Sequence, residues 1–250
     1  MRTWRYLLSF LFFVISLYSG CKKNDESTDP VDQSLAKSSE SDYLPIKPNQ
    51  TVAGTLNASI SIYDSSNNLT SSKVVQGQEV KGLFGEVTTV KNMTVLPVLG
   101  YSSEYKRYIL EGYLFNNNGE LQGVNKSSNP NDLNGLILPK EFTIGQEWTV
   151  NSVKSDVPSV KVKAIEAVKN YVTSVGNSYS DVVRLEVSFV DSSYGQLITF
   201  LGSIYLAKGK GIVEADVDNC TVNSYFHRYW DPASEWKIYK KTVIKATVGL

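Results

Sequence analysis

The sequence predicts an all-β protein: a strongly curved antiparallel meander, forming a half-barrel or open barrel of roughly ten to twelve strands. The chain contains 28 Val and only 9 Ala, and β-branched residues favour strands whereas Ala favours helices. Alternation of apolar and polar residues with period two recurs along the chain, and no stretch shows a sustained helical stripe. Turn-forming residues separate these runs at short intervals, which is typical of antiparallel hairpins.

The first strands follow from alternation that ends in turn residues. Ile60 and Ile62 alternate with serines before the string DSSNN. Tyr108, Leu110, Gly112 and Leu114 alternate ahead of NNNG. Asn and Gly tolerate positive φ, so both strings predict a hairpin turn.

The later strands are clearer. The best example spans 181–190, where Val183, Leu185, Val187 and Phe189 share one face. Similar faces run over 198–206, before the turn KGKG, and over 238–245. In 160–164 the alternation is regular, but its phase slips near Ile165, which predicts a bulge or a strand end.

We expect one β domain over residues 43–250. No internal repeat of 20 to 50 residues is evident. The segment 125–142 is rich in turn formers, so two sub-sheets are expected to meet there.

Residues 1–20 have the layout of a signal peptide. Arg2 and Arg5 precede an apolar run over 7–17, which is the order found in secretory signals. A membrane-spanning helix needs roughly 20 apolar residues, so this run is too short for a permanent anchor. Ser19 and Gly20 then lead directly into Cys21.

This arrangement resembles a bacterial lipoprotein signal, although Tyr18 stands where Leu, Val or Ile is usual. The resemblance implies that Cys21 carries diacylglycerol and becomes the new N-terminus; ordinary secretion with an incidental cysteine is the alternative. Residues 22–42 are polar and nearly free of aromatics, so residues 21–42 are expected to form a flexible tether behind the lipid.

The string KKNDE after Cys21 resembles the surface-export signal of Bacteroidota lipoproteins, and Lys22 resembles the residue of an outer-membrane-sorted lipoprotein. We therefore expect a lipid-anchored outer-membrane protein of the cell envelope, on either the cell surface or the periplasmic leaflet. A simple soluble linker is the alternative reading of KKNDE.

Three further strings carry a second resemblance: LILPKEFTIGQEW at 136–148, YSDVVRLEV at 179–187 and YLAKGKGIV at 205–213. In this order they resemble a group of uncharacterised Bacteroidota outer-membrane lipoproteins. The resemblance implies a half β-barrel similar to that of periplasmic lipoprotein carriers, with Gly209 and Gly211 in a tight turn. It implies neither a catalytic residue nor a cofactor.

The residue types in the chain point away from catalysis. The 25 basic and 25 acidic residues balance, which argues against a nucleic-acid partner. His227 is the only histidine, so the chain cannot supply the ligands of a typical zinc site. No G-x-S-x-G motif occurs. We expect no catalytic residue, no metal and no cofactor.

Glu214, Asp216 and Asp218 would share one face of a regular strand. Such a set could bind calcium, but we expect a solvated edge strand instead. Cys220 is expected to be a small buried hydrophobe rather than a reactive thiol.

Aromatic residues are concentrated around the string DPAS. Of these, Tyr229, Trp230 and Trp236 are the candidate ligand-binding residues, because Tyr and Trp combine a large contact area with a polar group. The alternative is that they fill the core of the half-barrel.

These observations predict a membrane-anchored lipoprotein that is a non-catalytic binding or structural module. Its partner could be a hydrophobic ligand, a glycan or an envelope protein. An apolar, unfilled concave face would favour a lipid, whereas a flat face with exposed Trp230 and Trp236 would favour a glycan. The alternative is an envelope hydrolase whose carboxylates converge only in the folded chain.

Overall fold

The computed structural model describes residues 38–39, 43, 47–90, 93–103, 105–118, 120–125, 135–150, 159–192, 196–226 and 237–250. Every element with bounds in this part of the chain is a β-strand. The strands of the first half are β1 (Ser38–Ser39), β2 (Thr51–Asp64), β3 (Leu69–Phe84), β4 (Thr88–Val90), β5 (Met93–Ser102), β6 (Arg107–Asn117), β7 (Glu120–Asn125) and β8 (Gly135–Leu138). Those of the second half are β9 (Glu141–Phe142), β10 (Glu147–Val150), β11 (Val160–Val172), β12 (Ser178–Asp191), β13 (Gln196–Ala207), β14 (Gly211–Phe226) and β15 (Lys237–Gly249).

One antiparallel sheet contains nearly all of these strands. Its order is β10-β11-β12-β13-β14-β15-β2-β3-β5-β6-β7-β8, with β4 added to β5, while β1 and β9 form a separate pair. The predicted curved all-β meander is therefore confirmed. Each half of the chain is a meander, and the two meanders are joined because β15 pairs with β2.

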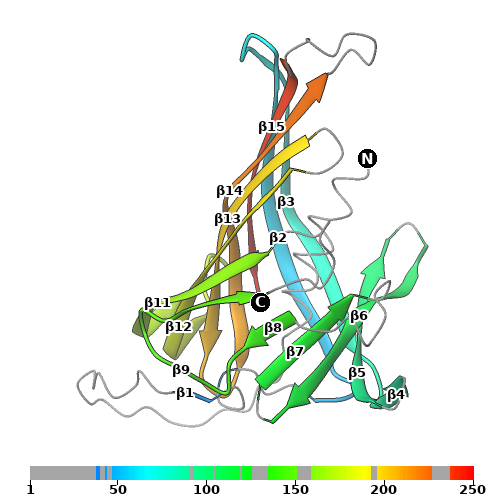
Figure 1. Cartoon of the computed structure of the whole chain (residues 1–250), viewed down its shortest axis with the longest axis vertical. Helices are drawn as coiled ribbons and strands as arrows, with labels where there is room; N and C mark the ends of the chain where they lie inside the picture. Colours follow the sequence, from blue (N-terminus) through cyan, green and yellow to red (C-terminus); the bar gives the residue numbers. More distant parts are fainter. Residues whose placement is uncertain are drawn as a thin grey trace.

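The sheet curls into a nearly closed barrel with one open seam (Figure 1). Its two edges are β8 and β10, which lie close to each other without forming a ladder. The indole Nε1–H of Trp148 on β10 donates to the Ile137 carbonyl on β8 at 3.2 Å. Trp148 also packs on Phe142, with the ring centroids 5.8 Å apart. The segment predicted to separate two sub-sheets contains one of these two edges.

The alternation of apolar and polar residues predicted most core positions correctly. Val183, Leu185 and Val187 on β12 are all buried in one core cluster that also contains Ile60 of β2 and Ile244 of β15. The phase slip predicted near Ile165 is a register shift between Ala164 and Glu166 in the β11–β12 ladder.

The turn predictions are also confirmed. Asp64 accepts backbone hydrogen bonds from Ser66 and Asn68 through Oδ1, which closes the first turn. Gly209 and Gly211 adopt positive φ angles of 68° and 94° in the turn between β13 and β14, a conformation that favours glycine.

A bulge interrupts the alternation of Tyr108, Leu110, Gly112 and Leu114 along β6. Leu99 pairs with Leu110, and the next residue, Val98, pairs with Gly112, so the ladder skips Glu111. This bulge shifts the phase of β6, and Leu114 is buried while Leu110 remains half-buried.

Candidate functional site

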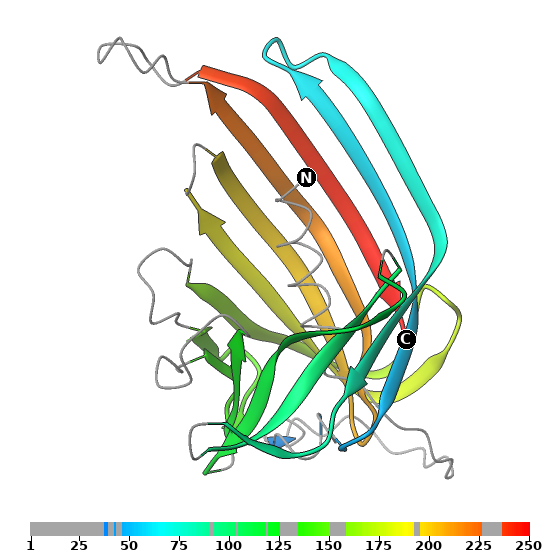
Figure 2. The same cartoon turned by 90° about the vertical axis from the view of Figure 1, so that its right-hand side faces the viewer.

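The concave face of the sheet carries an apolar strip, flanked on the same side by the polar residues Lys73, Asp191 and Thr242, which pair with Ile60, Ile198 and Ile62. Figure 2 looks onto this face, where long strands of the sheet extend upward beyond β5–β8. The apolar inward side chains of these strands are Ala58, Ile60 and Ile62 on β2, Ile244 and Ala246 on β15, Cys220 and Val222 on β14, and Ile198 and Phe200 on β13. They result directly from the period-two alternation, which sends every second residue to the same side.

This apolar strip begins in the closed lower part of the barrel. There the core contains large, fully buried side chains such as Tyr43, Phe84 and Phe142. Further along the strip, Ile62, Ile198 and Phe189 are only half-buried. Phe189 stacks on Phe200, with centroids 4.9 Å apart and planes at 11°. The concave face thus offers an apolar strip that ends in partly exposed side chains, with Thr242 and Asp191 beside this end.

The convex face of the same strands carries a polar cluster. Glu214 pairs with Tyr205, and Asp216 pairs with Ser203, so these side chains alternate with the inward Ala215 and Val217. Asp218 lies in a bulge and points to the same side, because its Oδ2 accepts a hydrogen bond from Ser203 Oγ at 3.0 Å. The prediction that the three carboxylates share one side is therefore confirmed.

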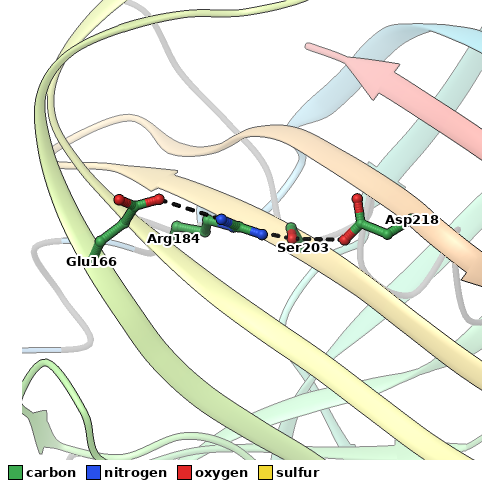
Figure 3. Close-up of polar contacts among 4 residues, drawn as sticks. All are labelled: Glu166, Arg184, Ser203 and Asp218. Carbon is green, nitrogen blue, oxygen red and sulfur yellow. Dashed lines mark hydrogen bonds and ion pairs between the residues drawn. The ribbon is translucent and has the colours of Figure 1, made fainter.

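A chain of polar contacts crosses four strands at this cluster (Figure 3). Arg184 Nε donates to Ser203 Oγ at 3.2 Å, and Arg184 Nη1 lies 3.4 Å from Glu166 Oε1. Ser203 is 1% exposed, and its Oγ–H donates a hydrogen bond to Asp218 Oδ2. The contacts tie β11, β12, β13 and β14 together on the outside of the barrel.

The prediction that Glu214, Asp216 and Asp218 lie on a solvated edge strand is wrong. This strand lies between β13 and β15, and Glu214 is only 4% exposed. Burial raises the pKa of Glu214, and neighbouring Asp216 raises it further, although the Ser174 N–H lowers it. Burial also raises the pKa of Asp216, and the Thr247 hydrogen bond opposes this shift.

The carboxyl groups of Glu214 and Asp216 can bind and release protons, but they are not arranged like the two catalytic carboxylates of a glycosidase. Glu214 and Asp216 are neighbours on one face of one strand, whereas paired catalytic carboxylates flank the bond that they cleave. Among the described residues, no group of three or more His, Cys, Asp or Glu side chains is placed to hold a metal ion. The calcium interpretation therefore has no support from this strand.

Cys220 is the buried hydrophobe that the sequence predicts. It is a free cysteine with 0% exposure, on the concave side of β14. Burial raises the pKa of its thiol to about 12, and a thiol that stays protonated is a poor nucleophile.

The other candidate residues lie outside the described part of the chain. These are the lipidation residue Cys21, the lone histidine His227 and the aromatic candidates Tyr229, Trp230 and Trp236. The signal peptide over 1–20 also lies there, as does nearly all of the tether.

Sequence reasoning missed Tyr171, Ser174, Arg184 and Tyr205, which surround the carboxylates. Tyr171 and Tyr205 stack with centroids 4.4 Å apart. The slip in alternation near Ile165 was the sequence feature that could have indicated these residues, because a bulge bends a strand and redirects the residues beyond it.

Within the described residues, no helix is both long and apolar enough to cross a membrane. No protein-family model, no curated protein and no solved structure matches the chain.

Proposed function

We propose that this protein is a bacterial outer-membrane lipoprotein, anchored through Cys21, whose β domain is a non-catalytic binding module for a hydrophobic ligand. The ligand class is an acyl chain, held along the concave face. The anchor places the domain at the membrane surface, where such chains are available. A glycan and an envelope protein are the other partners that the sequence leaves open.

The apolar concave face is the observation that supports this ligand. Ile62, Ile198 and Phe189 are half-buried and continue the buried core cluster. Burying apolar surface contributes roughly 25 cal/mol per Å², so an alkyl chain laid on these side chains gains affinity without requiring a polar partner. Ligand sites are commonly concave and apolar, and barrel mouths are among their usual places.

The anchor is supported by the order of Arg2 and Arg5, the apolar run over 7–17, and the string Ser19-Gly20-Cys21. Intact-mass analysis of the membrane-extracted protein tests it. The expected mass is that of a chain beginning at Cys21 and carrying a lipid. A mass showing an unmodified Cys21 would remove the lipoprotein assignment and leave the ligand proposal standing.

The ligand proposal is tested with a matched pair of substitutions on β13. Ile198→Asp places a charge on the concave face, opposite Val222, and should weaken binding of a fluorescent fatty acid by at least about tenfold, because burying an unpaired charge is costly. Thr199→Asp adds the same charge one residue later, at an exposed position on the convex side. This control should bind like the wild type.

Fluorescence titration of the full chain in mild detergent measures both affinities, and circular dichroism checks that each variant is folded. Equal weakening in both variants would show that the charge acts through general electrostatics. Absence of binding by the folded wild type would reject the acyl-chain ligand.

A further inference from the structure

The end of the β11–β12 hairpin folds back against the barrel. We refer to residues 168–180 as the arm. The arm begins just beyond the register shift at Ala164/Glu166 and ends at Asp181, which has a positive φ of 52°. Bulged strands bend, and in Figure 2 the yellow-green hairpin reaches past the end of β15.

Four contacts hold the arm on the convex face. The Ser174 N–H donates to Glu214 Oε2 at 2.6 Å. Asn177 Nδ2 and Tyr179 Oη donate to the Leu250 carbonyl at 3.3 and 3.2 Å. Tyr171 stacks on Tyr205 of β13.

Gly249 shows how closely the arm packs. A Cβ built on Gly249 would lie 2.7 Å from Cγ1 of Val175, which is closer than real Cβ contacts allow. A small apolar cluster of Val182, Ala207 and Val213 is buried beside this contact, with Tyr171 and Tyr179 packed against it. The arm therefore lies directly on β13, β14 and β15.

Glu214 lies at this contact, and Asp216 follows it on the same face of β14. Glu214 is 4% exposed. Asp216 is half-buried, and its Oδ1 is buried without a hydrogen-bond partner. A buried oxygen of this kind is costly when it carries charge.

The groups that face Glu214 and Asp216 come from the arm and from β12, β13, β14 and β15. They are Tyr171 and Ser174 on the arm, Arg184 on β12, Tyr205 on β13, Asp218 on β14 and Thr247 on β15. Arg184 is the only cation in this set, and it also contacts Glu166 and Ser203.

We propose that the arm is a proton-operated latch, which is closed on the convex face while Glu214 and Asp216 are protonated and is released when they ionise. The latch holds the end of β15, the strand that joins the two meanders. Acid therefore tightens the joint between the halves of the barrel, and a higher pH loosens it.

The sign of the effect follows from burial. Burial raises the pKa of both carboxyl groups above their ordinary values, and lifting the arm removes its contact with Glu214 and opens this part of the convex face to water. An acid whose pKa is higher in the closed state stabilises that state fully below its ordinary pKa, and the stabilisation is lost as the pH rises through the raised value. The Ser174 N–H and Tyr171 favour ionised Glu214, and Thr247, Tyr205 and Arg184 favour ionised Asp216, but burial outweighs them.

Hydrogen exchange of the full chain in detergent micelles tests the latch. We expect protection of the arm amides, corrected for intrinsic exchange, to fall severalfold between pH 4 and pH 8 as the two carboxyl groups ionise. The β14–β15 ladder around Val222 and Thr242 serves as the internal reference and should change little. Protection of the arm that is independent of pH, or that rises with pH, would overturn the proposal.

Substitutions assign the effect to the two carboxyl groups. The double variant Glu214→Gln/Asp216→Asn keeps the shape of both side chains without their charge, and its arm should remain as protected at pH 8 as the wild-type arm is at pH 4. Glu186→Gln is the control on the same face, because Glu186 pairs with Ser203 on the convex side and is not among the groups that face Glu214 and Asp216, so this variant should keep the wild-type pH dependence. If the folded double variant retains that dependence, the latch is not operated by these groups; if it does not fold, the wild-type profile against the internal reference decides.

Discussion

Phe84→Ala is expected to lower the free energy of unfolding by about 3–5 kcal/mol. Phe84 is 0% exposed in the main core cluster. It also lies in a short ladder of the first meander, where β3 and β5 pair only through Gly82, Leu83 and Phe84. Its own N–H donates to the Gln50 carbonyl at 2.9 Å, so truncating the ring opens a cavity at a junction with few other contacts.

Guanidinium unfolding followed by circular dichroism measures this loss. Leu69→Ala is the control, because Leu69 lies on the same strand but is 57% exposed, and exposed substitutions usually change stability by less than about 0.5 kcal/mol. Similar small losses in both variants would contradict the tight packing of the β3–β5 junction.

Trp148→Ala should cost a comparable amount, about 3–5 kcal/mol, but for a different reason. Trp148 is 7% exposed and lies where β8 and β10 meet. Truncation removes its packing on Phe142 and its hydrogen bond to the Ile137 carbonyl. Because the two edges share no ladder, these contacts stabilise the seam.

Trp148→Phe separates the two contributions in the same unfolding experiment. It keeps an aromatic ring against Phe142 but cannot donate to Ile137, so its expected cost is smaller, with about 1 kcal/mol coming from the lost hydrogen bond. Equal losses in the alanine and phenylalanine variants would show that the ring packing contributes nothing to the seam.

The sequence was sufficient to predict the fold class and most inward faces, because both depend on local alternation. Val183, Leu185 and Val187 show this, since all three are buried where the pattern placed them. The sequence pattern also indicated the bulge near Ile165, whereas it did not indicate the bulge at Glu111. Tyr108, Leu110, Gly112 and Leu114 include no polar residue that would have revealed the shift of phase.

The candidate sites were harder to predict, because they depend on contacts between distant segments. Glu214 has the sequence pattern of a solvated position, but Ser174 and Tyr171 lie against it. Local pattern contains no information about which strand an arm will cover. The pairing of β15 with β2 is a long-range choice of the same kind.

That pairing also constrains the order in which the protein can fold. Within each meander, consecutive strands are neighbours in the sheet. Hairpins can therefore form early, because the residues that pair in them lie close together in the sequence. The β2–β15 ladder instead joins the two ends of the domain, and contacts of such wide sequence separation slow folding. During synthesis, β2 must keep one edge unpaired until β15 is available, and an open edge is a site of aggregation. The domain therefore depends most on protection from other chains in the interval before its last strand is available.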